Sequence, residues 1–397
     1  MTLLQTITGA RARAEAWSVA WRERWADSQV VLLLAATATA EVPGISAAGA
    51  TAESRRQTAA ADAELLLFGP AGPRPHALPP LPAGVSPALI SHVVLRELNL
   101  APLIIDLGCA VPPATPHLRP GRGAGLGPSR HLCGGMAMDP GRVAELLRLG
   151  RLWARSMTRR FLPRPLLVAE CVPGGTTTAQ AVLTGLGVEA AGLVSGSLHQ
   201  PAHDLKAALV AEGLAAAGLT GPPLEVEAEG QRVVAAVGDP MQPLAAGLVM
   251  AAAEAGIPVM LAGGSQMAAV MALALALAPF PVRQRIVSLV ALGTTAWVVG
   301  EAGSDLCLLL ERIGERWGVS PLAFSAGLRF PEPIHPALAC YERGYVKEGV
   351  GAGGLALLWQ LSGRSPHQLA RACDLSCWEL FDPTPRRFHT PPGQGTT

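Results

Sequence analysis

The chain has 397 residues, which is enough for one large α/β unit with a smaller appended part. Half of the residues are apolar and only 15% are charged, so the composition indicates a large core and excludes a mostly disordered protein. The 31 basic and 30 acidic residues leave a formal charge of +1, and no long basic stripe is present, which excludes an extended nucleic-acid-binding surface.

The N-terminal residues and the cysteines indicate the cellular compartment in which the protein is expected. Residues 1–25 intersperse arginines and glutamates among apolar positions, which predicts an amphipathic helix rather than a secretory signal. The seven cysteines show no paired spacing, so a reduced, cytoplasmic protein is expected. Cys373 and Cys377 stand one helical turn apart, but no second Cys/His pair accompanies them, and we predict no metal site.

Short apolar runs recur between Ala-rich stretches and predict buried parallel strands. The runs span residues 30–34, 65–68, 103–105, 166–169, 233–237, 259–261 and 286–290. Helices between them would cover both faces, which predicts a three-layer, doubly wound, mostly parallel α/β sheet of the Rossmann-like class. Residues 255–280 are uncharged and long enough for a membrane span, but a strand, a polar turn and a buried helix at 267–277 explain them better, so no stable membrane insertion is expected.

The interruptions of this pattern suggest how the chain is divided. A Pro-rich linker covers 70–87, and a Gly/Pro-rich segment at 112–128 is predicted to be a long surface or lid loop. The expected parts are a helical segment of a small domain at 1–29, an α/β nucleotide-binding core at 30–330, a glutamate-bearing loop with further small-domain helices at 331–385, and a disordered tail at 386–397.

The most informative stretch runs from Glu170 to Thr178, directly after the apolar run at 166–169. It sets a carboxylate beside a turn with two glycines and a set of hydroxyls, at the carboxyl end of a predicted strand, where open α/β sheets bind ligands. Gly174 and Gly175 allow close backbone approach, the next helix presents free N–H groups, and the hydroxyls of Thr176 and Thr177 add donors. No lysine follows the glycines, so the stretch predicts a phosphate site other than a Walker P-loop.

Other polar or Gly-rich turns follow other predicted strands. They lie at 43–49, at Gly238 and at Gly263 and Gly264. If the strands are parallel, these turns share one edge of the sheet and form a ligand crevice there. The alternative is that they are ordinary βα connections, which are often rich in Gly and Ser.

Lys206 and Lys347 are the only lysines among the 31 basic residues. A compact ammonium suits a narrow phosphate pocket better than the planar fork of arginine. Lys206 follows a polar turn at 195–200 and is predicted to pair with a phosphate held by the turn at 174–178. The alternative to a functional role is that the two lysines remain in the sequence by chance.

Lys347 stands directly before Glu348 and a Gly-rich loop at 349–354, after which 355–361 is predicted to be a helix. The loop matches a dinucleotide fingerprint, but no apolar strand precedes it, which disfavours an NAD-dependent oxidoreductase. We interpret Glu348 as a functional carboxylate in a loop where Gly349 and Gly351 let a flat ring approach. The alternative is a solvated glutamate near a helix start.

Together these segments resemble the nicotinate-nucleotide:dimethylbenzimidazole phosphoribosyltransferase family, especially a divergent branch of longer chains. The stretch 170–179 resembles its phosphate motif, and Lys206 resembles its phosphate-contacting lysine. Residues 237–240 and 258–264 resemble its glycine-containing blocks, 347–353 its C-terminal segment with the catalytic base, and 43–49 and 62–64 motifs of the divergent branch.

The resemblance implies transfer of phosphoribose from nicotinate mononucleotide to a nitrogen of an aromatic base, for the lower ligand of a cobamide. Glu348 would remove the proton of the base, and Glu170 would orient the sugar hydroxyls or stabilise an oxocarbenium-like state. The resemblance also implies a homodimer, and the reaction requires no metal or organic cofactor.

The sequence departs from the family at 293–297 and in the base-pocket region near the N-terminus. The accepted base therefore stays open, with dimethylbenzimidazole, adenine or another base as candidates. Two further alternatives to an active transferase are a nucleotide-binding protein without transferase activity and a membrane-associated component of the same pathway.

Overall fold

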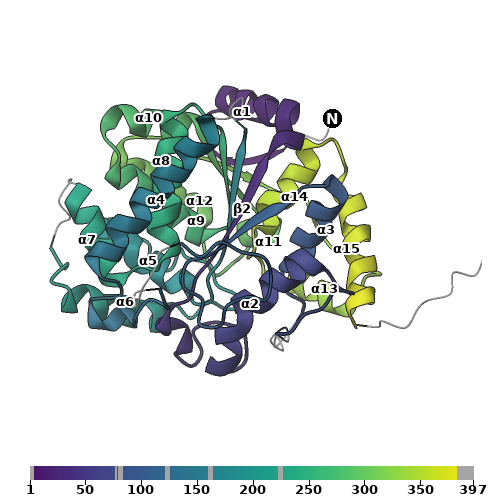
Figure 1. The fold of residues 1–397 in the computed structure, drawn as a ribbon, viewed down its shortest axis with the longest axis horizontal. Coiled ribbons are helices and arrows are strands. Elements are labelled where there is room, and N and C mark those ends of the chain that lie inside the picture. Colours follow the sequence, from purple (N-terminus) through teal and green to yellow (C-terminus); the bar gives the residue numbers. More distant parts are fainter. Residues whose placement is uncertain are drawn as a thin grey trace, which may run out of the picture.

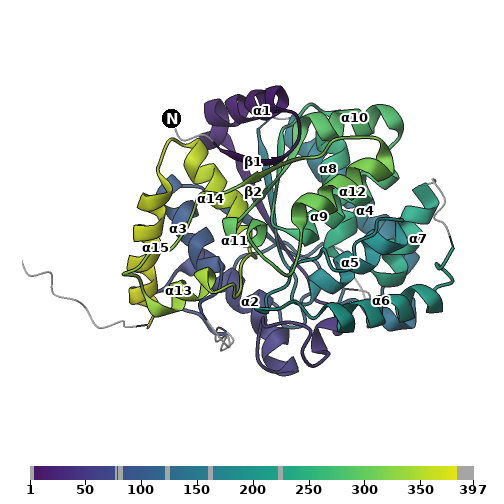
Figure 2. The same ribbon diagram turned by 180° about the vertical axis from the view of Figure 1, so that it is seen from behind.

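In the computed structural model, residues 4–76, 78, 84–120, 126–159, 164–221 and 227–381 are described. They contain a seven-stranded sheet with helices packed on both faces (Figures 1 and 2). The predicted tail at 386–397 lies outside the described residues, as do residues 121–125 of the predicted lid loop.

The strand order is β1-β7-β6-β5-β4-β2-β3, and all neighbours are parallel except β1, which is antiparallel to β7. The strands are β1 (Gln5–Thr8), β2 (Gln29–Leu34), β3 (Pro102–Asp106), β4 (Leu166–Cys171), β5 (Val259–Ala262), β6 (Val290–Thr294) and β7 (Leu322–Ser325). After β2 the chain adds β3 on one side, whereas β5, β6 and β7 are added beyond β4 on the other. The direction therefore reverses between β2 and β4, which is where such sheets bind ligands.

Two hydrophobic cores lie on the two faces of the sheet, because successive strand side chains point to opposite faces. In β2, for example, Val31 and Leu33 join one core and Leu32 joins the other. The first core is completed by α4 (Pro140–Arg159), α5 (Gly175–Gly185), α6 (His203–Ala216), α7 (Glu227–Val237), α8 (Met241–Glu254), α9 (Ser265–Leu277), α10 (Phe280–Leu289) and α12 (Leu306–Trp317). The second core is completed by α1 (Arg11–Arg24), α2 (Ala52–Phe68), α3 (Ala88–Leu98), α13 (Pro336–Glu342), α14 (Ala352–Leu361) and α15 (Pro366–Phe381).

The predicted doubly wound, mostly parallel sheet is confirmed, and four of the predicted strands become β2, β3, β4 and β5. Residues 255–280 contain β5 and α9, as the local pattern predicts. Within the described ranges, no helix combines the length and the apolar character that crossing a membrane requires.

The other predicted strands are wrong in position or type. The runs at 65–68 and 233–237 are the last turns of α2 and α7, and the run at 286–290 is mostly the end of α10, so β6 starts only at Val290. Each run is a buried helix end, and a run of four or five apolar residues does not distinguish this from a buried strand. Strands β1 and β7 were not predicted. The helix expected at 1–25 is confined to α1 (Arg11–Arg24), because residues 5–8 form β1.

Helix α14 packs unusually close to the end of β6, and Gly353 makes this possible. A Cβ built on Gly353 would lie only 2.2 Å from the carbonyl carbon of Thr294. The glycines after Glu348 therefore serve helix–strand packing as well as the loop itself, a role that glycines also have in dinucleotide-binding turns.

We expect Gly353→Ala to lower the free energy of unfolding by about 2–3 kcal/mol, because the added methyl group must displace the backbone of β6. Gly141→Ala is the matched control, since Gly141 is also the second residue of its helix, α4, and no atom lies within 4 Å of its built Cβ. Urea unfolding followed by circular dichroism measures both. Equal stability of the two variants would contradict the proposed close packing.

Candidate active site

A cavity of about 670 Å³ lies at the carboxyl ends of the central strands. One part of its wall comes from the loops after β2, β4 and β5, at 46–48, 170–176 and 264–266, together with the turn at 195–197. The segment 346–350 forms a further part of the wall. The cavity therefore lies at the switch between β2 and β4, where the topology favours a ligand.

Two helices begin at this cavity without a side-chain cap. Gly174 precedes α5 with φ of 76°, and a Cβ built there would lie 2.8 Å from Ala40, so the position requires glycine. Gly264 precedes α9, which also lacks a side-chain cap. Local turns occupy some of the first N–H groups, such as those of Gly175 and Met267, but the helix dipoles still favour an anion at these starts. This side of the cavity is suited to a phosphate group.

Lys206 supplies positive charge behind the same wall. It is fully buried, and its Nζ donates to the carbonyl oxygen of Ser195 at 3.0 Å. A Cβ built on Gly196, which lines the cavity, would lie 3.3 Å from this Nζ. Burial lowers the pKa of Lys206 to about 8, and the nearby Glu301 opposes that shift, so most of the positive charge remains at neutral pH.

The carboxylate of Glu348 is held by donors from β6 and from the start of α14. Its Oε2 accepts from Thr294 Oγ1 at 3.0 Å and from the N–H of Thr295 at 2.9 Å. Its Oε1 accepts from the N–H of Gly353 at 3.0 Å and, over a longer 3.2 Å, from that of Gly349. Burial raises the pKa of Glu348, and these bonds work in the opposite direction by favouring the ionised form.

Glu170 is the second carboxyl group of the cavity wall, at the end of β4. It is 2% exposed, and its Oε2 accepts from the N–H of Val172 at 3.1 Å. Burial raises the pKa of Glu170 to about 8, and the negative charge of Glu348 adds to the shift. Because Glu348 has more donors and its charge raises the pKa of Glu170, Glu170 is the member of the pair that holds a proton more readily.

The segment that carries Glu348 has an unusual backbone. Val346, Lys347 and Val350 have φ of 66°, 53° and 53°, and the neighbouring Gly349 and Gly351 also have positive φ. Branched side chains rarely adopt this conformation, so surrounding contacts must hold the segment in place.

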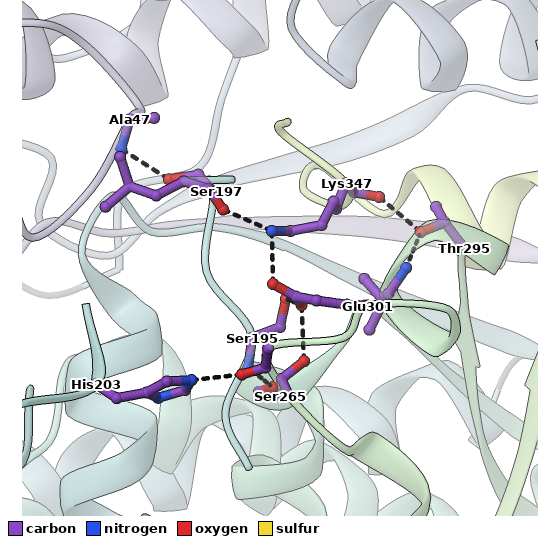
Figure 3. A network of polar contacts seen from close by, with 12 residues as sticks. Ala47, Ser195, Ser197, His203, Ser265, Thr295, Glu301 and Lys347 are labelled. Carbon is purple, nitrogen blue, oxygen red and sulfur yellow. Dashed lines mark hydrogen bonds and ion pairs between the residues drawn. The ribbon is translucent and has the colours of Figure 1, made fainter. Parts of the chain in front are cut away.

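A buried ion pair provides such contacts (Figure 3). Lys347 Nζ donates to Glu301 Oε1 and to the carbonyl oxygen of Leu198, both at 2.6 Å. Both side chains of the pair are almost fully buried, at 1% and 4% exposed. Glu301 also accepts from Ser195 Oγ, and Thr295 Oγ1 donates to the carbonyl oxygen of Lys347 at 2.6 Å. Lys347 therefore ties the Glu348 segment to the turn at 195–198.

The predicted site residues gather around this cavity, with one exception. The residues that line it are Glu170, Gly174, Gly175, Thr176, Gly264, Glu348 and Gly349. Those that lie next to the lining without forming it are Thr177, Lys206, Gly263 and Gly351. Gly238 lies elsewhere, between α7 and α8, where a built Cβ would be 2.5 Å from Val234 Cγ2, so the structure gives it a packing role.

Sequence reasoning gave no role to several residues of the remaining wall, which include Asp62, Arg74, His76, Ser86 and Phe381. Asp62 had one visible signal, since residues 62–64 resemble a motif of the divergent branch. Among the described residues, no group of three or more His, Cys, Asp or Glu side chains is placed to hold a metal ion. Cys373 and Cys377 are buried in the second core.

Comparison with known proteins agrees with the fold. Residues 91–287 match the family model described as phosphoribosyltransferase. The structure of nicotinate-nucleotide-dimethylbenzimidazole phosphoribosyltransferase from Thermus thermophilus has the same fold, with a TM-score of 0.53 and 21% identity over 88% of this chain and 82% of that chain. CobT from the same organism gives a TM-score of 0.55 at 21% identity, over 93% and 92% of the two chains.

The protein is thus a member of the phosphoribosyltransferase class that has this fold. More particularly, the chain belongs to the UPF0284 family, a divergent branch of that class. It is 52% identical over 380 residues to the UPF0284 protein of Prochlorococcus marinus. The matched region covers 93% of this chain and 91% of the relative. The resemblance that the motifs predict is confirmed.

We expect Lys347→Met to lower the free energy of unfolding by about 3–5 kcal/mol, because it leaves the carboxylate of Glu301 buried without its cation. The double variant Lys347→Met, Glu301→Gln should regain much of that loss. As a control, Arg148→Ala breaks an exposed ion pair with Glu145 and should change little. Urea unfolding of the four proteins gives the comparison. A double variant no more stable than Lys347→Met would contradict this account.

Proposed function

We propose that this protein transfers phosphoribose from nicotinate mononucleotide to a nitrogen of an aromatic base, giving an α-riboside phosphate and nicotinate for cobamide lower-ligand assembly. One observation carries the proposal: a single cavity combines two uncapped helix starts with two buried glutamates. The family membership and the motifs around Glu170 and Glu348 support it.

The nucleotide is oriented by the two chemically different parts of the cavity. Its phosphate binds at the starts of α5 and α9, where N–H groups point to the anion and Lys206 lies behind the wall. The ribose then lies beside Thr176 and Glu170, which provide hydrogen-bonding groups for its hydroxyls. The nicotinate ring is left facing the segment that carries Glu348.

The chemistry is a single displacement. A nitrogen of the base attacks C1′ of the ribose, the bond from C1′ to nicotinate breaks, and the N–H proton of the base passes to Glu348. The bond from Gly349 N–H is the longest of those that Glu348 accepts, so it is the one that the base N–H replaces. Attack opposite the leaving group inverts C1′, so a β-nucleotide gives an α-product.

The protonation of Glu170 selects between the two roles considered for it. With a pKa of about 8, Glu170 is mostly neutral at pH 7 and offers little charge to an oxocarbenium-like state. It does offer an O–H donor and an acceptor to the ribose hydroxyls. We therefore assign it to orienting the sugar. The proposed reaction uses no metal or organic cofactor, and we extend the proposal to a cytoplasmic homodimer on the family resemblance.

The direct test incubates the protein with nicotinate mononucleotide and a panel of bases, and follows nicotinate and the riboside phosphate by mass. We expect base-dependent product and a ~100- to 10,000-fold lower rate for Glu348→Gln, because the general base is lost. Nucleotide binding should persist in that variant. Glu97→Gln, a surface change outside the cavity lining, is the control. Nucleotide binding without product from any base would favour a non-catalytic binding protein.

The pH dependence of kcat/KM tests the pair of carboxyl groups. The rate should rise as Glu348 loses its proton and fall above about pH 8, where Glu170 loses the proton that its raised pKa retains. Glu170→Gln keeps this group neutral and should remove the fall on the alkaline side. A falling limb unchanged in Glu170→Gln would show that another group titrates there.

A further inference from the structure

Asp62 is a buried carboxyl group on the cavity wall that the proposed mechanism does not use. It lies on α2 and is 5% exposed. Its Oδ1 accepts from Ser86 Oγ at 2.6 Å, and its Oδ2 lies 3.4 Å from the thiol of Cys171. A carboxylate has about four lone-pair sites, so these two donors leave acceptor capacity unused.

Asp62 lacks a compensating cation. In the part of the chain that the structure describes, no Lys, Arg or His side chain forms an ion pair with it. The basic side chains nearby on the wall are engaged elsewhere: Arg74 Nη1 donates to the carbonyl oxygens of Gly69 and Pro70, and His76 Nδ1 is bonded to Glu64. Burying a carboxylate without full hydrogen bonding is costly, so this position is better explained by a ligand than by stability.

The place of Asp62 puts it on the base side of the cavity. Cys171, its thiol neighbour, directly follows Glu170. Ser86 precedes Pro87, and a Cβ built on Gly349 would lie 3.5 Å from Pro87 Cγ. Asp62 is thus connected through Ser86 and Pro87 to the segment that carries Glu348, whereas the phosphate side is formed by the starts of α5 and α9.

We propose that Asp62 determines which base is accepted, by taking a hydrogen bond from an exocyclic amino group of a purine-class base. The site would then prefer an aminopurine to a base whose edge carries only methyl groups. This inference rests on the proposed phosphoribosyl transfer and adds the substrate class to it.

The energetic reason is that the free-energy cost of filling the site differs between a base with an amino group and a base with methyl groups. An amino group replaces the hydrogen bonding that Asp62 gives up to water when a base fills the cavity, whereas methyl groups leave the carboxylate without that partner. A site built to bond an N–H group rejects an analogue lacking it far more strongly than an apolar pocket rejects an extra methyl. Burial raises the pKa of Asp62 only to about 6, so it remains mostly an acceptor at neutral pH.

The test compares adenine with purine, which differ only by the amino group, and adds dimethylbenzimidazole as the methylated base. With nicotinate mononucleotide saturating, wild-type kcat/KM should favour adenine over purine by roughly 10-fold or more. Asp62→Leu should bring the adenine-to-purine ratio close to one and raise the relative use of dimethylbenzimidazole. A ratio unchanged in Asp62→Leu, or a wild-type preference for dimethylbenzimidazole, would overturn the inference.

Two further variants separate recognition from folding. Glu53→Gln alters an exposed carboxylate of α2 outside the cavity lining, so its base ratio should equal that of wild type. Ser86→Ala removes only the hydroxyl that orients Asp62 and should lower the ratio partly. It serves as the test if Asp62→Leu does not fold.

Calorimetry of the same bases with the nucleotide-bound protein separates this inference from the proposed function. If no base yields product but adenine binds more tightly than purine in wild type and not in Asp62→Leu, the transferase proposal fails and recognition by Asp62 stands. If product forms with an adenine-to-purine ratio that Asp62→Leu does not alter, the transferase proposal stands and the inference fails.

Discussion

The site depends on keeping two carboxyl groups close together in a cavity largely shielded from water. The charge of Glu348 adds to the raised pKa of Glu170, so the two groups do not readily ionise together, and the surrounding donors decide which of them keeps a proton. Thr294, Thr295 and the start of α14 supply donors to Glu348, while Glu170 has the N–H of Val172 and the side chain of Gln266. The protein thereby obtains both a general base and a neutral hydrogen-bonding group from glutamate residues.

Holding Glu348 in place has a structural cost that is met outside the cavity. The segment 346–351 combines left-handed valines with a buried lysine, neither of which favours folding by itself. The ion pair between Lys347 and Glu301 and the close contact of Gly353 with β6 offset this cost by fixing the segment from two sides. Since Glu301 also bonds Ser195, the Glu348 segment and the turn in front of Lys206 are held as one unit.

Local patterns revealed part of this arrangement and missed the rest for physical reasons. The stretch from Glu170 to Thr178 was recognisable because its strand, turn and helix start are contiguous. The strands expected at 65–68 and 233–237 were wrong because the buried last turn of a helix is as apolar as a short strand. The partner of Lys347 was not predictable, because Glu301 is distant in the chain and only the packing of β6 and α11 (Ala296–Val299) brings it near.

The two halves of the cavity differ in how strongly the backbone constrains them. The phosphate side is made of backbone N–H groups, and the glycines that expose them must be contiguous, so it persists as a readable motif. The opposite side is made of single side chains from α2, the residues before α3 and the end of α15, none of which is required by the backbone. A substitution there alters the edge of the base that fits without disturbing the nucleotide, so divergence within this fold should concentrate on that wall.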